Sequence, residues 1–125
     1  MKKIIHTGGA PEAIGPYSQA VIAGGFIFIS GQLGIDPATK ELGGDVAAQA
    51  ERAMKNIGAI LREAGLDYDA IVKTTVLLAD INDFVKVNDV YSRFFRSDFP
   101  ARAAYAAAGL PRGALVEIEA IAYTG

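Results

Sequence analysis

The sequence predicts an α+β fold, a mixed β-sheet with two helices packed on one face. Two segments have the three-four spacing of apolar residues that amphipathic helices show. Between and around them lie shorter segments rich in β-branched and alternating apolar residues, which favour strands. No repeat or linker divides the 125 residues, so we expect a single domain spanning residues 1–125.

The N-terminal third predicts three strands. Residues 2–6 form a short one, and a loop rich in glycine and proline follows at 8–16. Residues 19–23 and 26–30 are apolar strands on either side of Gly24 and Gly25. Two successive glycines tolerate the positive φ angles of a type I′ turn, so we expect a hairpin there. Residues 31–44 are expected to be irregular, with a turn at 36–39.

The clearest helix covers residues 45–64. Asp45 is suited to cap its N-terminus, Gly65 to end it, and Glu51 and Lys55 are spaced for an i,i+4 ion pair. Its apolar positions recur every three or four residues: Val46, Ala50, Ala53, Met54, Ile57, Ile60, Leu61 and Ala64.

The C-terminal half predicts a buried strand at 71–79 and a strand with clean alternation at 115–123. Residues 102–108 are rich in alanine, which favours a helix, but the segment between two prolines is too short for an isolated helix, so we interpret it as a strand. A second helix is expected after Asn82, which could cap it. Its apolar stripe comprises Phe84, Val87, Tyr91, Phe94 and Phe95.

The composition limits the class of protein. A net charge of −2 offers no basic surface for nucleic acid. The chain has no cysteine, which excludes disulfides and suits the reducing cytoplasm, where we expect the protein. No apolar segment is long enough to cross a membrane. The apolar share of 51% is high for a small domain and suggests that partner subunits cover part of the surface.

Candidate catalytic groups are few. Glu117 and Glu119 lie on the same face of the last strand. This face could be an ordinary polar face in contact with water. Alternatively, one of the two carboxylates could be shielded from water, so that its pKa rises and it acts as a catalytic base. Arg102 follows a proline and precedes small residues, and its planar guanidinium matches a carboxylate. Arg112 is the competing arginine, but it lies in a predicted turn and is expected to be solvated.

Other signals do not predict a cofactor or a metal site. His6 has no cysteine or acidic partner at ligand spacing, so we expect a histidine at a strand edge. Gly31 and Gly34 do not form a phosphate or dinucleotide motif. Asn88 borders the aromatic stripe of the second helix, and a hydrogen-bonded helix amide is its ordinary interpretation.

Six segments together carry a resemblance to a known family. Their set resembles the Rid (YjgF) family, most closely its RidA-type 2-iminobutanoate/2-iminopropanoate deaminases. The resemblance implies a chorismate-mutase-like fold, a homotrimer with clefts between subunits, and hydrolysis of reactive 2-imino acids to 2-keto acids and ammonia without a cofactor. The segments are residues 10–20, 29–42, 46–61, 71–91, 99–104 and 110–122.

The resemblance also implies roles for particular residues. Arg102 matches the arginine that pairs with the substrate carboxylate, and Glu117 matches the glutamate that holds the hydrolytic water. Tyr17 and Asn88 match residues that line the cleft. The backbone at Gly31 matches a loop that contacts the ligand.

One position departs from the pattern, because Ala104 stands where many RidA-type sequences have cysteine. A required nucleophilic cysteine is therefore excluded. Two alternatives remain open on the same scaffold, namely a ribonuclease or translation inhibitor and a non-enzymatic ligand sensor or chaperone. The sequence does not specify the preferred imino acid or whether Glu119 assists Glu117.

Overall fold

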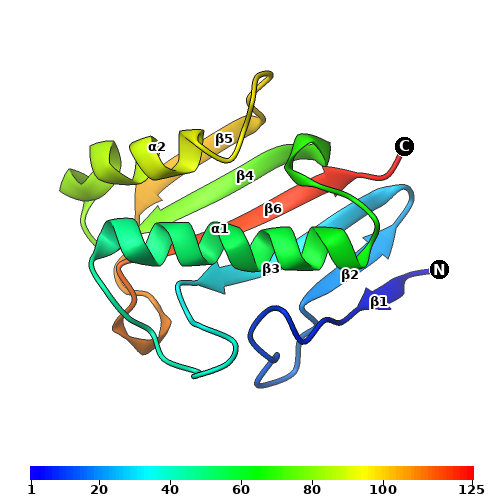
Figure 1. Ribbon diagram of the computed structural model, residues 1–125, viewed down its shortest axis with the longest axis horizontal. Coiled ribbons are helices and arrows are strands. Elements are labelled where there is room, and N and C mark those ends of the chain that lie inside the picture. The colour runs from blue at the N-terminus through cyan, green and yellow to red at the C-terminus, as the bar shows by residue number, and fades with distance from the viewer.

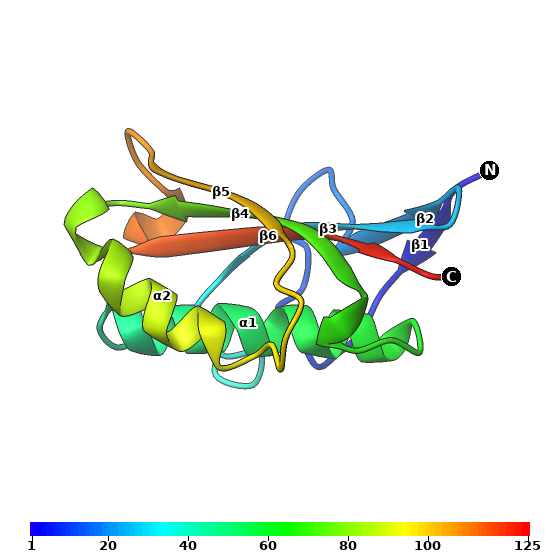
Figure 2. The same ribbon diagram turned by 90° about the horizontal axis from the view of Figure 1, so that it is seen from above.

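The computed structural model describes residues 1–125 as one six-stranded mixed sheet with both helices on the same side (Figures 1 and 2). This confirms the predicted α+β arrangement. The strand order is β1-β2-β3-β6-β4-β5, and only β4 and β5 run parallel to each other. The strands are β1 Lys3–Ile5, β2 Ala20–Ala23, β3 Phe26–Leu33, β4 Ile71–Leu78, β5 Ala101–Ala106 and β6 Val116–Tyr123.

The hairpin between β2 and β3 forms as predicted. Gly24 has φ 58° and Gly25 has φ 84°, the positive pair that a type I′ turn requires. β3 continues to Leu33, beyond the predicted end at residue 30. A register shift against β6 between Ile29 and Gln32 places one extra residue in β3, and this bulge lets pairing resume where an irregular segment was expected.

The long helix α1 (Val46–Glu63) lies across the sheet (Figure 1). The Asp45 side chain accepts a hydrogen bond from the backbone N–H of Ala48 at 2.9 Å, which confirms the predicted cap. The C-cap of the helix is Ala64. Gly65, which was predicted to end the helix, follows it directly and adopts the left-handed conformation, with φ 78°. Lys55 and Glu51 form the predicted pair at 3.2 Å.

Helix α2 (Phe84–Ser92) connects β4 to β5 and lies beside α1 on the same face of the sheet (Figures 1 and 2). The prediction that Asn82 caps this helix is wrong. Asp80 accepts from the N–H of Asn82 and begins a 3₁₀ turn, η2 (Ile81–Asp83), which leads into α2 without a side-chain cap.

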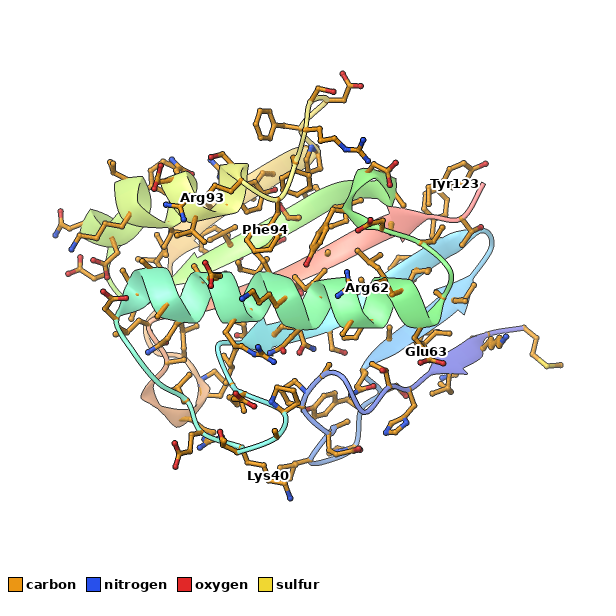
Figure 3. All side chains as sticks on the ribbon, viewed as in Figure 1. Lys40, Arg62, Glu63, Arg93, Phe94 and Tyr123 are labelled. Carbon is orange, nitrogen blue, oxygen red and sulfur yellow. The ribbon has the colours of Figure 1, made fainter.

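The aromatic stripe extends past the end of α2. Phe94 and Phe95 were expected within the helix, but they follow Ser92. They still pack against the core, because their rings lie 5.2 and 6.5 Å from that of Tyr68, measured between centroids. Phe94 is seen between the two helices in Figure 3. The 3₁₀ turn η1 (Tyr68–Ala70) supplies this tyrosine.

The segment with ambiguous propensity, predicted as a strand at 102–108, forms an edge strand that ends at Ala106, so residues 107 and 108 lie outside it. β5 (Ala101–Ala106) pairs in parallel with β4 along its length, so hydrogen bonding to the sheet overrides the helical preference of alanine. Its outer edge has no neighbouring strand.

The two faces of the sheet differ sharply. One face and the helices enclose the core, including Ile27, Met54, Ile57 and Ile118, all with no exposed surface. The opposite face, hereafter the open face, is bare of helices (Figure 2) and exposes large apolar side chains. Those at least 47% exposed are Ile4, Phe28, Tyr105 and Tyr123. No helix is long and apolar enough to cross a membrane.

Candidate functional site

A cavity of about 890 Å³ lies between the loop before β2, the end of β3 with its following loop, and the turn before β6. Among the predicted site residues, Tyr17, Gly31 and Glu117 line it. Three different parts of the sequence therefore meet here. Arg102 and Asn88 do not line this cavity.

Glu117 and Gly31 are in close contact across the β3–β6 ladder. Glu117 pairs with Leu33, and the bulge of β3 brings Gly31 beneath its carboxylate. A Cβ built on Gly31 would lie 2.5 Å from Oε2 and 2.9 Å from Cδ of Glu117. The carboxylate occupies the space that any side chain at position 31 would need, so its present position depends on glycine.

The protein environment of the Glu117 carboxylate favours its protonated form, compared with the same carboxylate in water. Burial raises the pKa of Glu117 above its ordinary value of 4.5, and the negative charge of Glu119 raises it further. The strand alternation is as predicted, with Val116 and Ile118 facing the helices. A half-buried carboxylate with a raised pKa, at a cavity wall, is suited to accept a proton from water.

The buried Gln19 holds the loop that carries Tyr17. Its Nε2 donates to the carbonyl oxygens of Thr7, Ala10 and Pro11, and its Oε1 accepts from the N–H of Thr7 at 2.8 Å. Gln19 is only 2% exposed and also lines the cavity. Gln19 was not among the residues predicted to form the site. The available signal was a glutamine at the start of an otherwise apolar strand.

The mouth of the cavity carries both signs of charge. Lys40 and Arg112 line it together with Glu12, Asp36 and Glu119. Lys40 lies at the outer end of the loop between β3 and α1 (Figure 3).

Arg112 lies in an exposed turn, as predicted, with φ 59°, and its guanidinium donates to the carbonyl oxygen of Lys40 at 3.3 and 3.4 Å. Arg112 nevertheless lines the same cavity as Glu117, which was not expected of a side chain predicted only to be solvated.

Arg102 belongs to a second cluster, on the helix face of the sheet's edge. Its Nη1 donates to Oδ1 of Asn88 at 2.7 Å. The guanidinium carbon lies 5.3 Å from the ring centre of Phe84 and 5.0 Å from that of Tyr91, both on α2. Arg102 and Asn88, two of the predicted site residues, are thus in contact. Arg102 is exposed, and its guanidinium makes no other hydrogen bond.

Within one protomer, Arg102 and Glu117 lie on opposite faces of the sheet. Arg102 is in register with Thr74, which faces the helices, whereas Glu117 is in register with Leu77, three residues further along β4 and so on the other face. A single chain does not bring the two predicted catalytic groups together. A site that uses both would therefore require a second copy of the chain.

The two remaining predictions concern His6 and metals. His6 follows β1 and is exposed, but it has an acidic partner that its sequence spacing did not indicate, because its Nε2 lies 3.0 and 3.1 Å from the Glu12 carboxylate oxygens. No group of three or more histidine, cysteine, aspartate or glutamate side chains is arranged to hold a metal ion.

Comparison with known proteins places the chain in a family. Residues 7–124 match the family model described as endoribonuclease L-PSP. A bovine 2-iminobutanoate/2-iminopropanoate deaminase is 61% identical over the whole chain and 92% of its own length, and the human protein of that name is 56% identical over the same shares. The crystal structure of the E. coli YjgF gene product superposes with a TM-score of 0.95, at 48% identity, over 98% of this chain and 99% of that one.

The fold and the full-length similarity define an α+β protein of the YjgF type. The chain belongs to the Rid (YjgF) family, whose model carries the L-PSP name. The resemblance identified from six sequence segments is thereby confirmed.

Proposed function

We propose that the protein hydrolyses reactive 2-imino acids, such as 2-iminobutanoate and 2-iminopropanoate, to the corresponding 2-keto acids and ammonia. The observation that carries this proposal is the half-buried Glu117 carboxylate above Gly31, at the wall of a cavity of about 890 Å³. The names of full-length relatives that are 54–61% identical supply the substrate class.

The chemistry requires only the groups that this chain carries. Glu117 accepts a proton from water as the water oxygen forms a bond to C2 of the protonated imine, and the C=N π electrons move to nitrogen. Protonated Glu117 then gives that proton to the carbinolamine nitrogen. The C–N bond breaks, ammonia leaves, and the hydroxyl group returns a proton to Glu117 as the C=O bond of the keto acid forms. A positioned general base contributes on the order of 10²–10⁴ in rate, which is enough for an electrophile that already reacts with water.

Arg102 would hold the substrate carboxylate. Its guanidinium uses one N–H for Asn88 and keeps others for a ligand. A charge-assisted contact of this kind contributes about 1.5–3 kcal/mol and fixes the reacting carbon relative to the base. Tyr17 and Gly31 would line the same cleft from the subunit that supplies Glu117.

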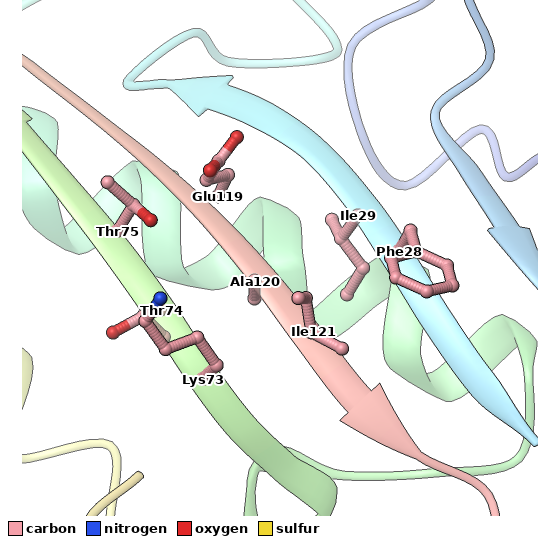
Figure 4. Close-up of a pocket in the computed structure, with 8 residues that line it drawn as sticks. All are labelled: Phe28, Ile29, Lys73, Thr74, Thr75, Glu119, Ala120 and Ile121. Carbon is pink, nitrogen blue, oxygen red and sulfur yellow. The ribbon is translucent and has the colours of Figure 1, made fainter. Parts of the chain in front are cut away.

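The proposal includes an oligomer, because the two half-sites lie on different faces of one chain, and the family resemblance implies that this oligomer is a homotrimer. The open face supports it. A pocket of about 170 Å³ lies there. Five of its lining residues, Phe28, Lys73, Thr75, Glu119 and Ile121, are labelled in Figure 4. Lys73 and Glu119 form no ion pair within the protomer, and the apolar side chains around them are uncovered. A second copy seated on this face would bury them.

Direct turnover tests the proposed function. An amino-acid oxidase generates the imine in the presence of semicarbazide, which traps the imine that remains. We expect the protein to lower the yield of trapped product in proportion to its concentration, and Arg102→Ala to abolish this effect while the oligomer persists. Trapped product that is unchanged by the wild-type protein would refute the proposal.

An endoribonuclease is the second candidate, because the matched family model carries that name. The charges argue against it, since the net charge is −2 and the cavity lining contains four acidic and two basic side chains, Glu12, Asp36, Glu117 and Glu119 against Lys40 and Arg112. RNA cleavage that is lost in Glu117→Gln would favour it, and cleavage that disappears on further purification would not.

Three narrower points stay proposals. A ligand sensor would bind 2-oxobutanoate but give no turnover, so the trapping assay separates it from an enzyme. The predicted cytoplasmic location is checked by cell fractionation. Ala104 packs against the core from β5, beside the helix-facing position of Arg102, and its effect on substrate preference is checked by Ala104→Cys.

A further inference from the structure

Arg102 lies where little in its own strand would hold it in place. β5 is an edge strand, and the neighbours of Arg102 in that strand are alanines, which cannot confine a long side chain. An unrestrained guanidinium on such a strand would sample many rotamers. Restricting the side chain to one of them when the substrate binds would cost conformational entropy.

The structure instead encloses the guanidinium on three sides. Asn88 accepts a hydrogen bond at 2.7 Å, and the rings of Phe84 and Tyr91 lie 5.3 and 5.0 Å from the guanidinium carbon. The three residues, hereafter the Arg102 seat, come from successive turns of α2 and face the same way. Such distances are those of cation–π contacts.

Tyr91 is itself fixed by a buried hydrogen bond. Its hydroxyl lies 2.6 Å from Oγ1 of Thr74, and the two residues are 4% and 1% exposed. Thr74 is in register with Arg102 on the neighbouring strand. These contacts form a closed loop. It runs from the Arg102 backbone through the β4–β5 pairing to Thr74, from Thr74 to the Tyr91 hydroxyl, and from the Tyr91 aromatic ring back to the Arg102 guanidinium.

The chemistry of Tyr91 suits this role. Burial raises the pKa of Tyr91, so the side chain stays a neutral phenol that offers a π face to the cation, and it does not neutralise the guanidinium as a carboxylate would. The only ion pair on α2 joins Arg93 to Asp89, and both are exposed. The positive charge of Arg102 thus stays available for an anion.

We propose that Tyr91 and Thr74 are positioning residues for the reaction. The hydrogen bond between their hydroxyl groups fixes the aromatic ring of Tyr91, and this ring holds the Arg102 guanidinium in place for the substrate carboxylate. The inference rests on the proposed function, in which Arg102 binds that carboxylate. It goes further by assigning a function to a buried pair that touches no substrate. Tyr91→Phe and Thr74→Val each remove one hydroxyl while keeping the shape of the side chain.

The test compares Tyr91→Phe with Tyr68→Phe. Tyr68 is a matched control, because its hydroxyl donates to the carbonyl oxygen of Met54 at 2.8 Å and its ring packs with Phe94, away from Arg102. We expect both variants to melt at a lower temperature. Only Tyr91→Phe should raise KM, and the Kd of 2-oxobutanoate measured by calorimetry, by roughly three- to tenfold with kcat little changed.

Two further variants test the route through Arg102. Tyr91→Phe should add nothing to the KM of Arg102→Lys, and Thr74→Ser should restore what Thr74→Val loses. The inference is overturned if Tyr91→Phe lowers the melting temperature with KM and Kd unchanged, as Tyr68→Phe should, or if its effect persists in the Arg102→Lys background.

A ligand-free measurement separates this inference from the proposed function. In NMR spectra of the wild-type protein, the Arg102 Nε–H signal should be shifted by the two rings, and Tyr91→Phe should reduce that shift. An averaged, unshifted signal in the wild type would overturn the inference even if the enzyme is active. Absence of turnover with a shifted signal would instead refute the proposed function.

Discussion

Replacing Gly31 by alanine tests whether the position of the Glu117 carboxylate matters. A Cβ at position 31 would lie 2.5 Å from Oε2, whereas ordinary contacts begin at 3.4 Å, so the carboxylate must retreat by about 1 Å. The backbone at Gly31 has no positive φ, so alanine is acceptable to the main chain. Misplacing a catalytic group by about 1 Å costs on the order of 10² in rate, and we expect that loss in kcat.

The stability of Gly31→Ala should change little. The group it meets is the end of a flexible side chain, and replacing a strand glycine by alanine favours folding by roughly 0.5–1 kcal/mol. Gly34→Ala is the contrasting variant, because its Cβ would lie 2.5 Å from Cα of Gln49 on α1 and would strain the backbone packing. Gly43→Ala is the neutral control, with no atom within 4 Å of its Cβ.

Imine-trapping assays and thermal melts distinguish these cases. Gly31→Ala should lose about 100-fold in kcat with a nearly unchanged melting temperature, and should lose little more when combined with Glu117→Gln. Gly34→Ala should mainly melt earlier, and Gly43→Ala should behave as the wild type. A fully active Gly31→Ala would refute the view that the placement of Glu117 above this glycine is part of the catalytic site.

Three further predictions concern the charged groups. Arg102→Ala should lower kcat/KM by on the order of 10²–10³ in the trapping assay, with the oligomer retained in size-exclusion chromatography. Because the raised pKa of Glu117 favours the protonated form in the folded state, its contribution to stability is present below pH 4.5 and is lost as pH rises through the raised pKa. The melting temperature of Glu117→Gln relative to the wild type should therefore increase over that window. Glu119→Gln removes a charge that raises the same pKa, so the acid limb of the pH–rate profile should move to lower pH.

Most of the sheet could be predicted from local patterns. Gly24 and Gly25 specify a hairpin, and the alternation around Glu117 assigns both faces of β6. The end of β3 could not be predicted, because a bulge depends on the partner strand and not on β3 alone. The start of α2 was mispredicted because Asp80 caps the 3₁₀ turn η2 that precedes it, so Asn82 lies inside that turn and caps nothing.

The candidate site could be predicted only in part. Residue types identified Arg102 and Glu117, but no sequence pattern reports that they lie on opposite faces of the sheet. Gln19 was not predicted because its role depends on four hydrogen bonds to the loop before β2. The conformation of that loop cannot be inferred from the sequence. The family resemblance pointed to Asn88 only as a residue that lines the cleft. Its hydrogen bond to Arg102, and the contacts through Tyr91 and Thr74, required coordinates.

Subunit mixing tests the central claim most directly, namely that one copy supplies Arg102 and another supplies Glu117. Arg102→Ala and Glu117→Gln proteins, each inactive alone, are unfolded together in equal amounts and refolded. If sites form between copies of a trimer, about a quarter of the wild-type activity should return, because about one interface in four combines both intact groups. If the mixture stays as inactive as its components, while wild-type protein recovers from the same treatment, the two groups do not share a site between subunits.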